Sequence, residues 1–385
     1  MYNILTLNKI SKSGLSNFDP EKFVCSETAE NPDAVIVRSA SMHDMELPAN
    51  LLAVARAGAG VNNIPIEKCT ENGICVFNTP GANANAVKEL VICSLFLVSR
   101  KIVDGAKWCE SLKGEGADVS KKVEKGKSAF AGPEIMGKTL GIIGLGAIGV
   151  LVANAAKALG MNVIGYDPFI SPAAKEGLCP EIAVTTALDN IFSSSDYITL
   201  HAPLTDSTRG VINAANLEKA KDGVRILNFS RAELVDNTDI LSALSSGKCA
   251  AYATDFPTDE QLKSNGVTAL PHLGASTPEA EENCAVMAVK QLGDYLTNGN
   301  VKNSVNLPEL SLQKSARIRI TAITKGDKAS EIEKCLAESG MEITNKTSAI
   351  KKDTGYCIFD TDTDITDDTL EELKSIDGVL AIRII

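Results

Sequence analysis

Short apolar runs alternate with helical stretches through the first third of the chain. The runs at 2–8 and 33–39 are apolar and contain β-branched side chains, which predicts strands. Two further runs, at 51–58 and 73–80, continue the alternation. Strands that alternate with helices are typical of a parallel sheet with helices on its faces, so the pattern predicts an α/β fold.

Two segments have helical periodicity over a longer stretch. Apolar side chains recur every three or four positions over 85–110 and again over 278–299, which predicts two long helices. The polar stretch at 111–138 is rich in lysine and glycine and predicts a loop or a surface extension at a domain boundary. Four of its lysines are either solvated or in contact with a substrate across a subunit boundary, namely Lys121, Lys122, Lys125 and Lys127.

Strands and helices alternate closely between residues 139 and 274, which predicts five or six parallel strands in a doubly wound sheet. The flanking long helices indicate that the chain leaves a first domain near residue 95 and returns to it near 280. We therefore expect a discontinuous substrate-binding domain at 1–95 and 280–305. A nucleotide-binding domain would occupy 96–279, with the ligand in a cleft between the two.

The tail has its own pattern of elements. Residues 315–385 give the order strand, helix, strand, strand, helix, strand. That order is typical of a ferredoxin-like split βαβ module, so we expect a third, separate domain there.

Composition and charge exclude several classes of protein. The chain is 44% hydrophobic and 23% charged, as in ordinary globular proteins. Its net charge of −11 gives no electrostatic reason to bind nucleic acid. No run approaches the roughly 18 apolar residues of a membrane helix, and the first residues lack a signal-peptide pattern. We expect neither a nucleic-acid nor a membrane partner.

Cysteine and histidine usage points to a reducing compartment. The ten cysteines are scattered without a C-x-x-C pair, and the three histidines lie far apart. Unpatterned thiols fit the cytoplasm, and this spacing suggests no local metal motif. We therefore expect a cytoplasmic protein without a metal.

A glycine-rich turn joins the strand at 139–143 to the helix that follows. It reads G-x-G-x-x-G and consists of Gly144, Leu145, Gly146, Ala147, Ile148 and Gly149. In this context the glycines permit a tight turn and the close approach of a pyrophosphate to the helix N-terminus. Asp167 ends the next strand, where it can accept from ribose hydroxyls and repel a 2′-phosphate. The sequence thus predicts NAD as cofactor.

Three further polar positions could perform acid–base chemistry. Arg231 follows a strand and can hold a carboxylate through two hydrogen bonds. His272 follows a later strand and suits exchange of a hydroxyl proton near neutral pH. Asp259 and Glu260 lie between them in sequence, and either could orient His272.

Four segments together resemble the D-isomer-specific 2-hydroxyacid dehydrogenases, namely 137–149, 201–213, 228–236 and 269–285. The resemblance covers residues 1–305 and implies two Rossmann-like doubly wound domains. It also implies a catalytic trio of Arg231, His272 and an acid. Family spacing after Asp255 favours Glu260 as that acid and leaves Asp259 open.

The resemblance further implies the ligand contacts. Besides the glycine turn and Asp167, the cofactor would touch His201, Ala202, Pro203, Phe229, Ser230, Arg231, Asp255, His272, Leu273, Gly274 and Ala275. The segments 38–42, 53–66 and 76–90 match members that oxidise 3-phospho-D-glycerate, the first step toward L-serine. They imply Arg38 and Ser39 for the phosphate, with Ala59, Gly60 and Asn62 near the substrate carboxylate.

In the implied reaction, Arg231 holds the carboxylate, His272 removes the hydroxyl proton and Glu260 stabilises the imidazolium. Alternatives within the family are a glyoxylate or hydroxypyruvate reductase and a D-lactate or 2-hydroxyglutarate dehydrogenase. An NAD-sensing corepressor is the alternative from another class. The family also implies a homodimer or homotetramer.

The tail resembles an ACT domain but departs from the serine-binding pattern. Members that bind serine carry an Asn-x-Pro-Gly-like turn after the first strand, whereas residues 321–334 contain neither the Asn nor the Pro. An assembly or vestigial role is therefore favoured over the alternative, feedback binding of serine.

Overall fold

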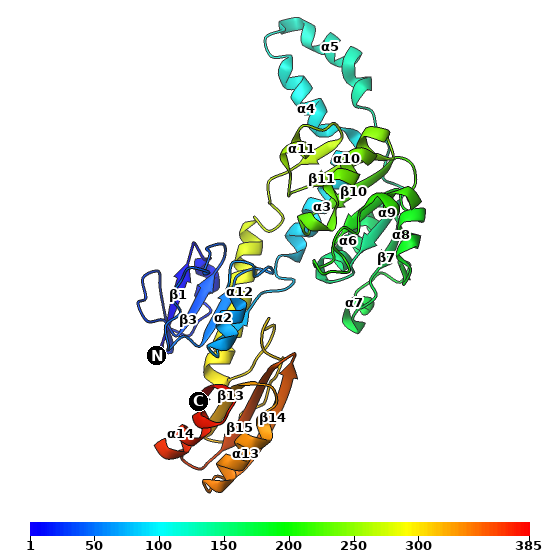
Figure 1. Cartoon of the computed structure of the whole chain (residues 1–385). Coiled ribbons are helices and arrows are strands. Elements are labelled where there is room, and N and C mark those ends of the chain that lie inside the picture. Colours follow the sequence, from blue (N-terminus) through cyan, green and yellow to red (C-terminus); the bar gives the residue numbers. More distant parts are fainter. The chain divides into compact units, whose positions relative to one another are not determined.

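The computed structural model describes all 385 residues, which divide into two compact units. The first unit comprises Met1–Asn83 and Pro278–Ile385, and the second comprises Ala84–Thr277. Figure 1 follows the chain through both. The three-domain division expected from the sequence stays a prediction. None of the helices combines the length and apolar character needed to cross a membrane.

The first unit contains a five-stranded parallel sheet in the order β2-β1-β3-β4-β5. Its strands are β1 (Tyr2–Leu7), β2 (Phe23–Ser26), β3 (Ala34–Val37), β4 (Ala53–Arg56) and β5 (Cys75–Phe77). The apolar runs predicted all of them except β2, which has only four residues and two exposed side chains. The central strand β3 is buried throughout, as expected for a parallel sheet covered on both faces.

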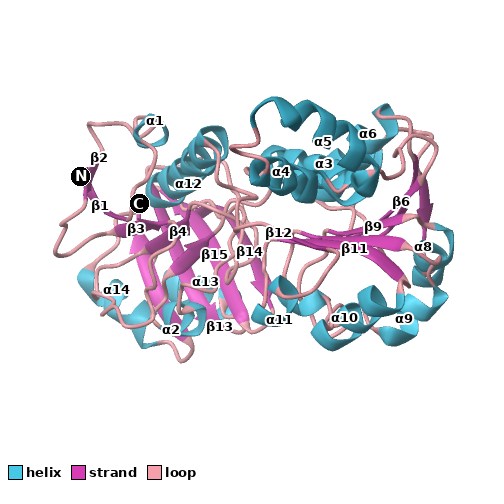
Figure 2. Ribbon diagram, turned by 90° about the horizontal axis from the view of Figure 1, so that it is seen from above, coloured by secondary structure: helices cyan, strands magenta, loops and turns pink.

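Helices cover both faces of this sheet. The long helix α12 (Pro278–Asn298) packs its Ala288, Leu292 and Tyr295 on one face, against Ile4 and Ile36. On the other face, Cys69 of α2 (Ile66–Glu71) packs with Val35 and Val54. Figure 2 shows α12 and α2 on opposite sides of the strands. The short α1 (Lys12–Leu15) packs against α12.

The second unit is built on a seven-stranded parallel sheet in the order β12-β11-β10-β9-β6-β7-β8. This is the doubly wound order, in which the order of strands along the sheet reverses between β6 and β9. Its strands are β6 (Thr139–Ile143), β7 (Asn162–Tyr166), β8 (Ala183–Thr185), β9 (Tyr197–Leu200), β10 (Val224–Asn228), β11 (Cys249–Thr254) and β12 (Val267–Ala269). The prediction of five or six strands was too low, because the three-residue edge strand β8 has no buried side chain to mark it.

The seven strands lie between two layers of helices. One layer holds α3 (Ala84–Arg100) and α6 (Ala147–Ala158), and the other holds α8 (Leu188–Ser194), α9 (Ala214–Lys219) and α10 (Asn237–Ser246). Figure 2 shows the two layers on opposite sides of the sheet. The remaining short elements are α7 (Pro172–Glu176), the 3-10 turn η3 (Ala232–Leu234) and α11 (Asp259–Leu262).

The prediction of one long helix over 85–110 was wrong. Helix α3 ends at Arg100, and Lys101 adopts a left-handed conformation with φ of 45° before α4 (Ile102–Ser111) begins. The stretch at 111–138, expected to be a loop or a surface extension, contains short helices, namely η1 (Gly116–Asp118), α5 (Val119–Gly126) and η2 (Lys127–Phe130). Trp108 and Phe130 pack together with ring centroids 5.3 Å apart. In Figure 1 α4 and α5 project from the rest of the second unit.

The tail folds as the predicted β-α-β-β-α-β module and belongs to the first unit. Its elements are β13 (Ile318–Lys325), α13 (Ala329–Glu338), β14 (Ile343–Lys351), β15 (Thr354–Thr361), α14 (Asp367–Ser375) and β16 (Val379–Ile384). The antiparallel sheet has the order β14-β15-β13-β16. Arg319 and Arg383 bind the C-terminal end of α12, donating to the Asn298 carbonyl across 2.7 Å and the Leu296 carbonyl across 2.9 Å.

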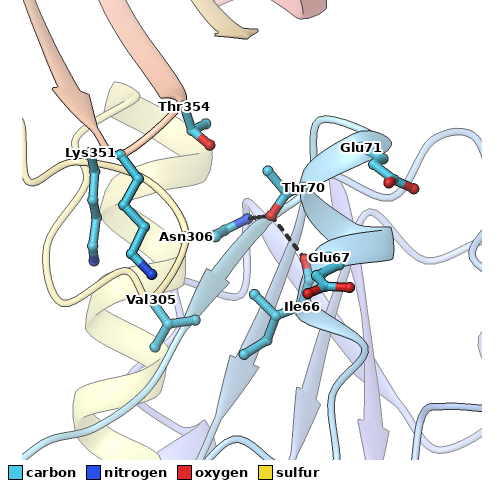
Figure 3. A pocket seen from close by; sticks show the side chains of 9 residues that line it. Ile66, Glu67, Thr70, Glu71, Val305, Asn306, Lys351 and Thr354 are labelled. Atoms are coloured by element: carbon cyan, nitrogen blue, oxygen red, sulfur yellow. Dashed lines mark hydrogen bonds between the residues drawn. The ribbon is translucent and has the colours of Figure 1, made fainter. Parts of the chain in front are cut away.

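A cavity of about 330 Å³ lies between α2 and the β14–β15 hairpin. Figure 3 shows Asn306 and Thr70 joined on one side of it, where the amide donates to the hydroxyl across 3.0 Å, and Lys351 on the other side. Lys351 donates to the Ser304 carbonyl across 2.7 Å. None of the residues that the sequence assigns to the reaction lines this cavity.

Candidate active site

The glycine turn between β6 and α6 needs two of its glycines for steric reasons. Gly144 has a φ of 98°, which side chains disfavour. A Cβ on Gly149 would lie 2.0 Å from the Gly144 carbonyl oxygen, so the helix could not pack this closely on the strand. A Cβ on Gly146 would instead meet no atom within 4 Å. The backbone beside Gly146 is thus open to a ligand at the start of α6.

Asp167, which follows β7, is fixed against this turn. One carboxylate oxygen accepts from the Leu145 amide across 2.9 Å, and the other accepts from the Phe169 amide across 2.8 Å. Each carboxylate oxygen has a further lone pair, so the group can also accept from ribose hydroxyls. Asp167 follows the strand that the sequence predicted, and its contact with a ribose stays a prediction.

A cavity of about 320 Å³ opens between the glycine turn, Asp167 and the segment after β9. Gly144, Gly146, His201, Ala202 and Pro203 are among the residues that line it. A ligand in contact with all of them would therefore touch both sides of the point where the strand order reverses, where doubly wound folds bind nucleotides.

His201 contributes a neutral ring to this cavity. Its Nε2 lies 3.0 Å from the Thr199 hydroxyl, and its Nδ1 is buried without a hydrogen-bond partner. Burial lowers the pKa of His201 to about 3, so the ring is uncharged near neutral pH. The open backbone at Gly146, the carboxylate of Asp167 and the free nitrogen of His201 all fit a dinucleotide.

Arg231 and Asp255 follow the neighbouring strands β10 and β11, and the charge of Arg231 acts on the Asp255 carboxyl. Asp255 is 3% exposed, and no other side chain forms a hydrogen bond to its carboxylate. Burial raises the pKa of Asp255 to about 6, although its own amide, Arg231 and the Gly274 amide oppose the rise. The site thus contains a carboxyl group that titrates near neutral pH.

His272 follows β12, the next strand along the sheet. Its ring packs on Phe256 with centroids 4.8 Å apart, and Phe256 adjoins Asp255. Three adjacent parallel strands therefore deliver Arg231, Asp255 and His272 to one edge of the sheet. Phe256 has no role that the sequence predicts, because an aromatic residue in a loop carries no signal of its own.

The two candidate acids lie in α11 and differ in their surroundings. Asp259 and Glu260 are both exposed. Asp259 forms an ion pair with Lys263 one turn later, whereas the Glu260 carbonyl accepts from the Ser264 hydroxyl. The side chain of Glu260 is thus the less engaged of the two.

Phe229 and Ser230, the other predicted cofactor contacts on this edge, occupy the turn after β10. The Ser230 hydroxyl donates to the Leu200 carbonyl of β9 across 2.8 Å, and Phe229 is buried. Arg231 Nη1 donates to the Ser230 carbonyl across 2.6 Å. The turn is therefore fixed to the neighbouring strand while Arg231 remains exposed at its end.

In the first unit, the predicted substrate residues gather after β3 and β4. Arg38 and Ser39 follow β3, and the Ser39 amide donates to the Asn8 side chain across 3.1 Å. Ala59 and its neighbours Gly60 and Asn62 follow β4, and the Ala59 carbonyl accepts from the Asn78 side chain across 2.7 Å. Adjacent parallel strands thus bring both groups to one edge.

Two residues of this group were missed by the sequence analysis. Arg56 ends β4, and its Nε donates to the Arg38 carbonyl across 3.1 Å. Glu281 on α12 pairs with the Arg38 guanidinium across 2.8 Å. The contact between Arg38 and Glu281 joins positions far apart in the chain, so no local sequence pattern predicts it.

A doubly wound sheet with a glycine turn and an acidic residue after β7 is the architecture of dinucleotide-binding domains. Residues 93–276 match the family model for the D-isomer specific 2-hydroxyacid dehydrogenase NAD-binding domain. The hydroxypyruvate reductase of Thermotoga maritima is 42% identical over 272 residues, which are 68% of this chain and 83% of that protein. The chain therefore belongs to the D-isomer-specific 2-hydroxyacid dehydrogenase family, a family of NAD-dependent oxidoreductases, as the sequence predicted.

Two other relatives are phosphoglycerate dehydrogenases. The D-3-phosphoglycerate dehydrogenase of Bacillus subtilis is 32% identical over 363 residues, 89% of this chain and 66% of that protein. The crystal structure of NAD+-bound 3-phosphoglycerate dehydrogenase from Entamoeba histolytica has a TM-score of 0.62 at 26% identity, covering 80% of this chain and 99% of that one. The chain spans about half to two thirds of the length of the first curated relatives it matches.

Proposed function

We propose that the protein is a D-3-phosphoglycerate dehydrogenase that oxidises 3-phospho-D-glycerate to 3-phosphohydroxypyruvate with NAD, the first step toward L-serine. The observation that carries this proposal is the presence of two arginines, Arg38 and Arg56, at the ends of β3 and β4. A simple 2-hydroxy acid presents one carboxylate, for which Arg231 suffices. A phosphorylated acid presents a second anionic group and calls for further guanidinium donors.

The glycine turn, Asp167 and His201 would hold the cofactor. Bound there, NAD supplies the acceptor for the hydride that leaves the hydroxyl-bearing carbon. Asp167 would accept from the ribose, and the neutral His201 would offer its free nitrogen without placing a charge beside the cofactor.

The acid–base step is assigned to the edge formed by β10, β11 and β12. Arg231 holds the substrate carboxylate through two hydrogen bonds, which orients the hydroxyl. His272 accepts the hydroxyl proton as general base, and Glu260 stabilises the imidazolium that results. The engagement of Asp259 with Lys263 supports Glu260 in this role.

The remaining assignments stay predictions. These are the cytoplasmic location, the homo-oligomer, the ACT-like role of the tail and the contacts of Ser39, Ala59, Gly60 and Asn62 with substrate. The rival function is hydroxypyruvate reduction, which the name of the Thermotoga maritima relative favours.

A substrate panel tests the proposal. NADH oxidation would be followed by absorbance with 3-phosphohydroxypyruvate, hydroxypyruvate, glyoxylate, pyruvate and 2-oxoglutarate. We expect kcat/KM to be highest for the phosphorylated acid, by at least about tenfold over hydroxypyruvate. A preference for hydroxypyruvate or glyoxylate would make the protein a reductase of the same family. Tight NADH binding without turnover of any acid would instead point to a sensing protein.

A further inference from the structure

Arg38, the predicted phosphate ligand, is already paired with a carboxylate. Its Nη1 lies 2.8 Å from a carboxylate oxygen of Glu281, and the two side chains are 32% and 36% exposed. Glu281 belongs to the first turn of α12, where the helix dipole favours a negative charge. The Glu281 carboxylate thus lies at the place where a substrate phosphate would approach Arg38.

Arg56 adds a third charged group here, because its Nε donates to the Arg38 carbonyl across 3.1 Å. The buried thiol of Cys284 lies one turn along α12 from Glu281. Burial raises the pKa of Cys284, the charges of Arg56 and Arg38 lower it, and the charge of Glu281 raises it. All three charges therefore act on one point. We call Arg38, Arg56 and Glu281 the arginine–glutamate cluster.

The charge balance of this cluster is poor for a phosphate. Two guanidinium groups and one carboxylate sum to a single positive charge, whereas a phosphate monoester carries nearly two negative charges at neutral pH. A phosphate on Arg38 would also approach the Glu281 carboxylate, and like charges at such separations repel appreciably near a protein surface. An uncharged 2-hydroxy acid tail would meet no such penalty.

We propose that Glu281 is a specificity-determining residue that weakens phosphate binding at Arg38 and so limits the preference for phosphorylated over unphosphorylated 2-hydroxy acids. The inference rests on the proposed function in taking Arg38 as the phosphate ligand. Glu281 acts through Arg38 by competing for its donors and by repelling the phosphate. The partial exposure of both side chains lets the pair open when substrate arrives.

The test compares Glu281→Gln with Glu282→Gln. The first variant keeps the size and a hydrogen-bonding oxygen beside Arg38 but removes the charge. The second removes the same charge from the next residue of α12, which is exposed and does not pair with Arg38. For each, KM and kcat would be measured with 3-phosphohydroxypyruvate and with hydroxypyruvate, together with inhibition by inorganic phosphate.

We expect Glu281→Gln to lower KM for the phosphorylated acid and the inhibition constant of inorganic phosphate about tenfold, with kcat and the hydroxypyruvate constants nearly unchanged. Glu282→Gln should change the ratio of the two substrates less than about twofold. Weaker phosphate binding in Glu281→Gln, or an equal shift for both substrates, would overturn the inference, because Glu281 would then merely orient Arg38.

The outcome is separable from that of the proposed function. If the wild type prefers hydroxypyruvate, the proposed function fails, while tighter phosphate inhibition in Glu281→Gln would still support the role of Glu281. If the wild type prefers the phosphorylated acid and Glu281→Gln leaves both phosphate readouts unchanged, the function stands and the inference fails. Thermal melting of each variant identifies a folding defect, and Glu281→Ser then provides a second uncharged side chain for the same measurements.

Discussion

The carboxylate of Asp167 accepts a hydrogen bond from the backbone amide of Leu145 across 2.9 Å. This contact joins the residue after β7 to the glycine turn after β6, so the cofactor's ribose and pyrophosphate would be bound by one rigid assembly. The same carboxylate would repel a phosphate on the ribose 2′-oxygen.

Asp167→Asn should therefore weaken the binding of NADH and reduce the preference of the protein for NADH over NADPH. We expect roughly a tenfold rise in the dissociation constant of NADH, as for loss of a hydrogen bond to a charged group. The constants would come from fluorescence titration with each dinucleotide. Asp222→Asn, in which a 93% exposed carboxylate of the same unit is neutralised, is the control. An unchanged preference for NADH over NADPH would mean that Asp167 does not contact the ribose.

Replacing His272 should remove the general base. We expect His272→Gln to lower kcat by about 10²- to 10⁴-fold, because proton transfer then relies on water. Steady-state kinetics at saturating NAD and substrate would measure this, with circular dichroism to establish folding. Turnover within about threefold of the wild type would exclude His272 as the base.

Asp259 and Glu260 can be distinguished by pH dependence. A carboxylate beside the imidazolium raises the imidazole pKa, so activity in the oxidation direction rises with pH through that pKa. Removing the partner carboxylate lowers the imidazole pKa and moves this rise to lower pH. We expect Glu260→Gln to shift the acid limb of kcat/KM downward by roughly one unit and Asp259→Asn to leave it in place. The reverse pattern would give the role to Asp259.

The sequence predicted what depends on local pattern. The glycine turn and Asp167 were found because a strand, a turn and a helix follow one another in a short stretch. The four-residue β2, the three-residue β8 and the break at Lys101 were missed, because each depends on packing or on one backbone torsion angle. The pairing of Arg38 with Glu281 and the burial of Asp255 arise only when distant segments meet, so no spacing in the sequence reports them.

Asp255 should destabilise the fold at neutral pH. Its folded pKa of about 6 lies above the usual value of 3.8, so the folded state binds the proton more tightly than the unfolded state. The stability contributed by this group is therefore present at low pH and is lost as the pH rises through about 6. Asp255→Asn keeps the shape without the charge.

We expect Asp255→Asn to melt at a higher temperature than the wild type at about pH 7.5, with the difference shrinking toward about pH 4.5. Calorimetric scans across this pH range would measure it. Asp118→Asn, at an exposed carboxylate, serves as the control and should show no such trend. A wild type more stable than Asp255→Asn at neutral pH would mean that Arg231 outweighs the burial of the carboxylate.

The tail contains a fully buried ion pair, and its removal should be costly. Arg319 donates to Asp360 through Nε across 2.7 Å and through Nη2 across 2.9 Å, and both side chains are 0% exposed. Burial by itself would raise the pKa of Asp360, but the hydrogen bonds from Arg319 and Ser315 together with the charge of Arg319 hold it below its usual value. Either partner left alone would be a buried, uncompensated charge.

We expect Asp360→Asn to destabilise the tail by about 3–5 kcal/mol, the range for breaking one side of a buried pair. The matched control is Asp364→Asn, which breaks the Arg317–Asp364 pair of the same module, where the side chains are 60% and 79% exposed. An exposed pair of this kind contributes at most about 1 kcal/mol. Urea unfolding followed by circular dichroism would compare the two variants.

Because Arg319 also binds the Asn298 carbonyl, Asp360→Asn should loosen the end of α12, and hydrogen exchange of its last turn should rise. Equal stability of the two variants would show that the carbonyls of Asn298 and Leu312, to which Arg319 Nη1 donates, compensate Arg319 without Asp360.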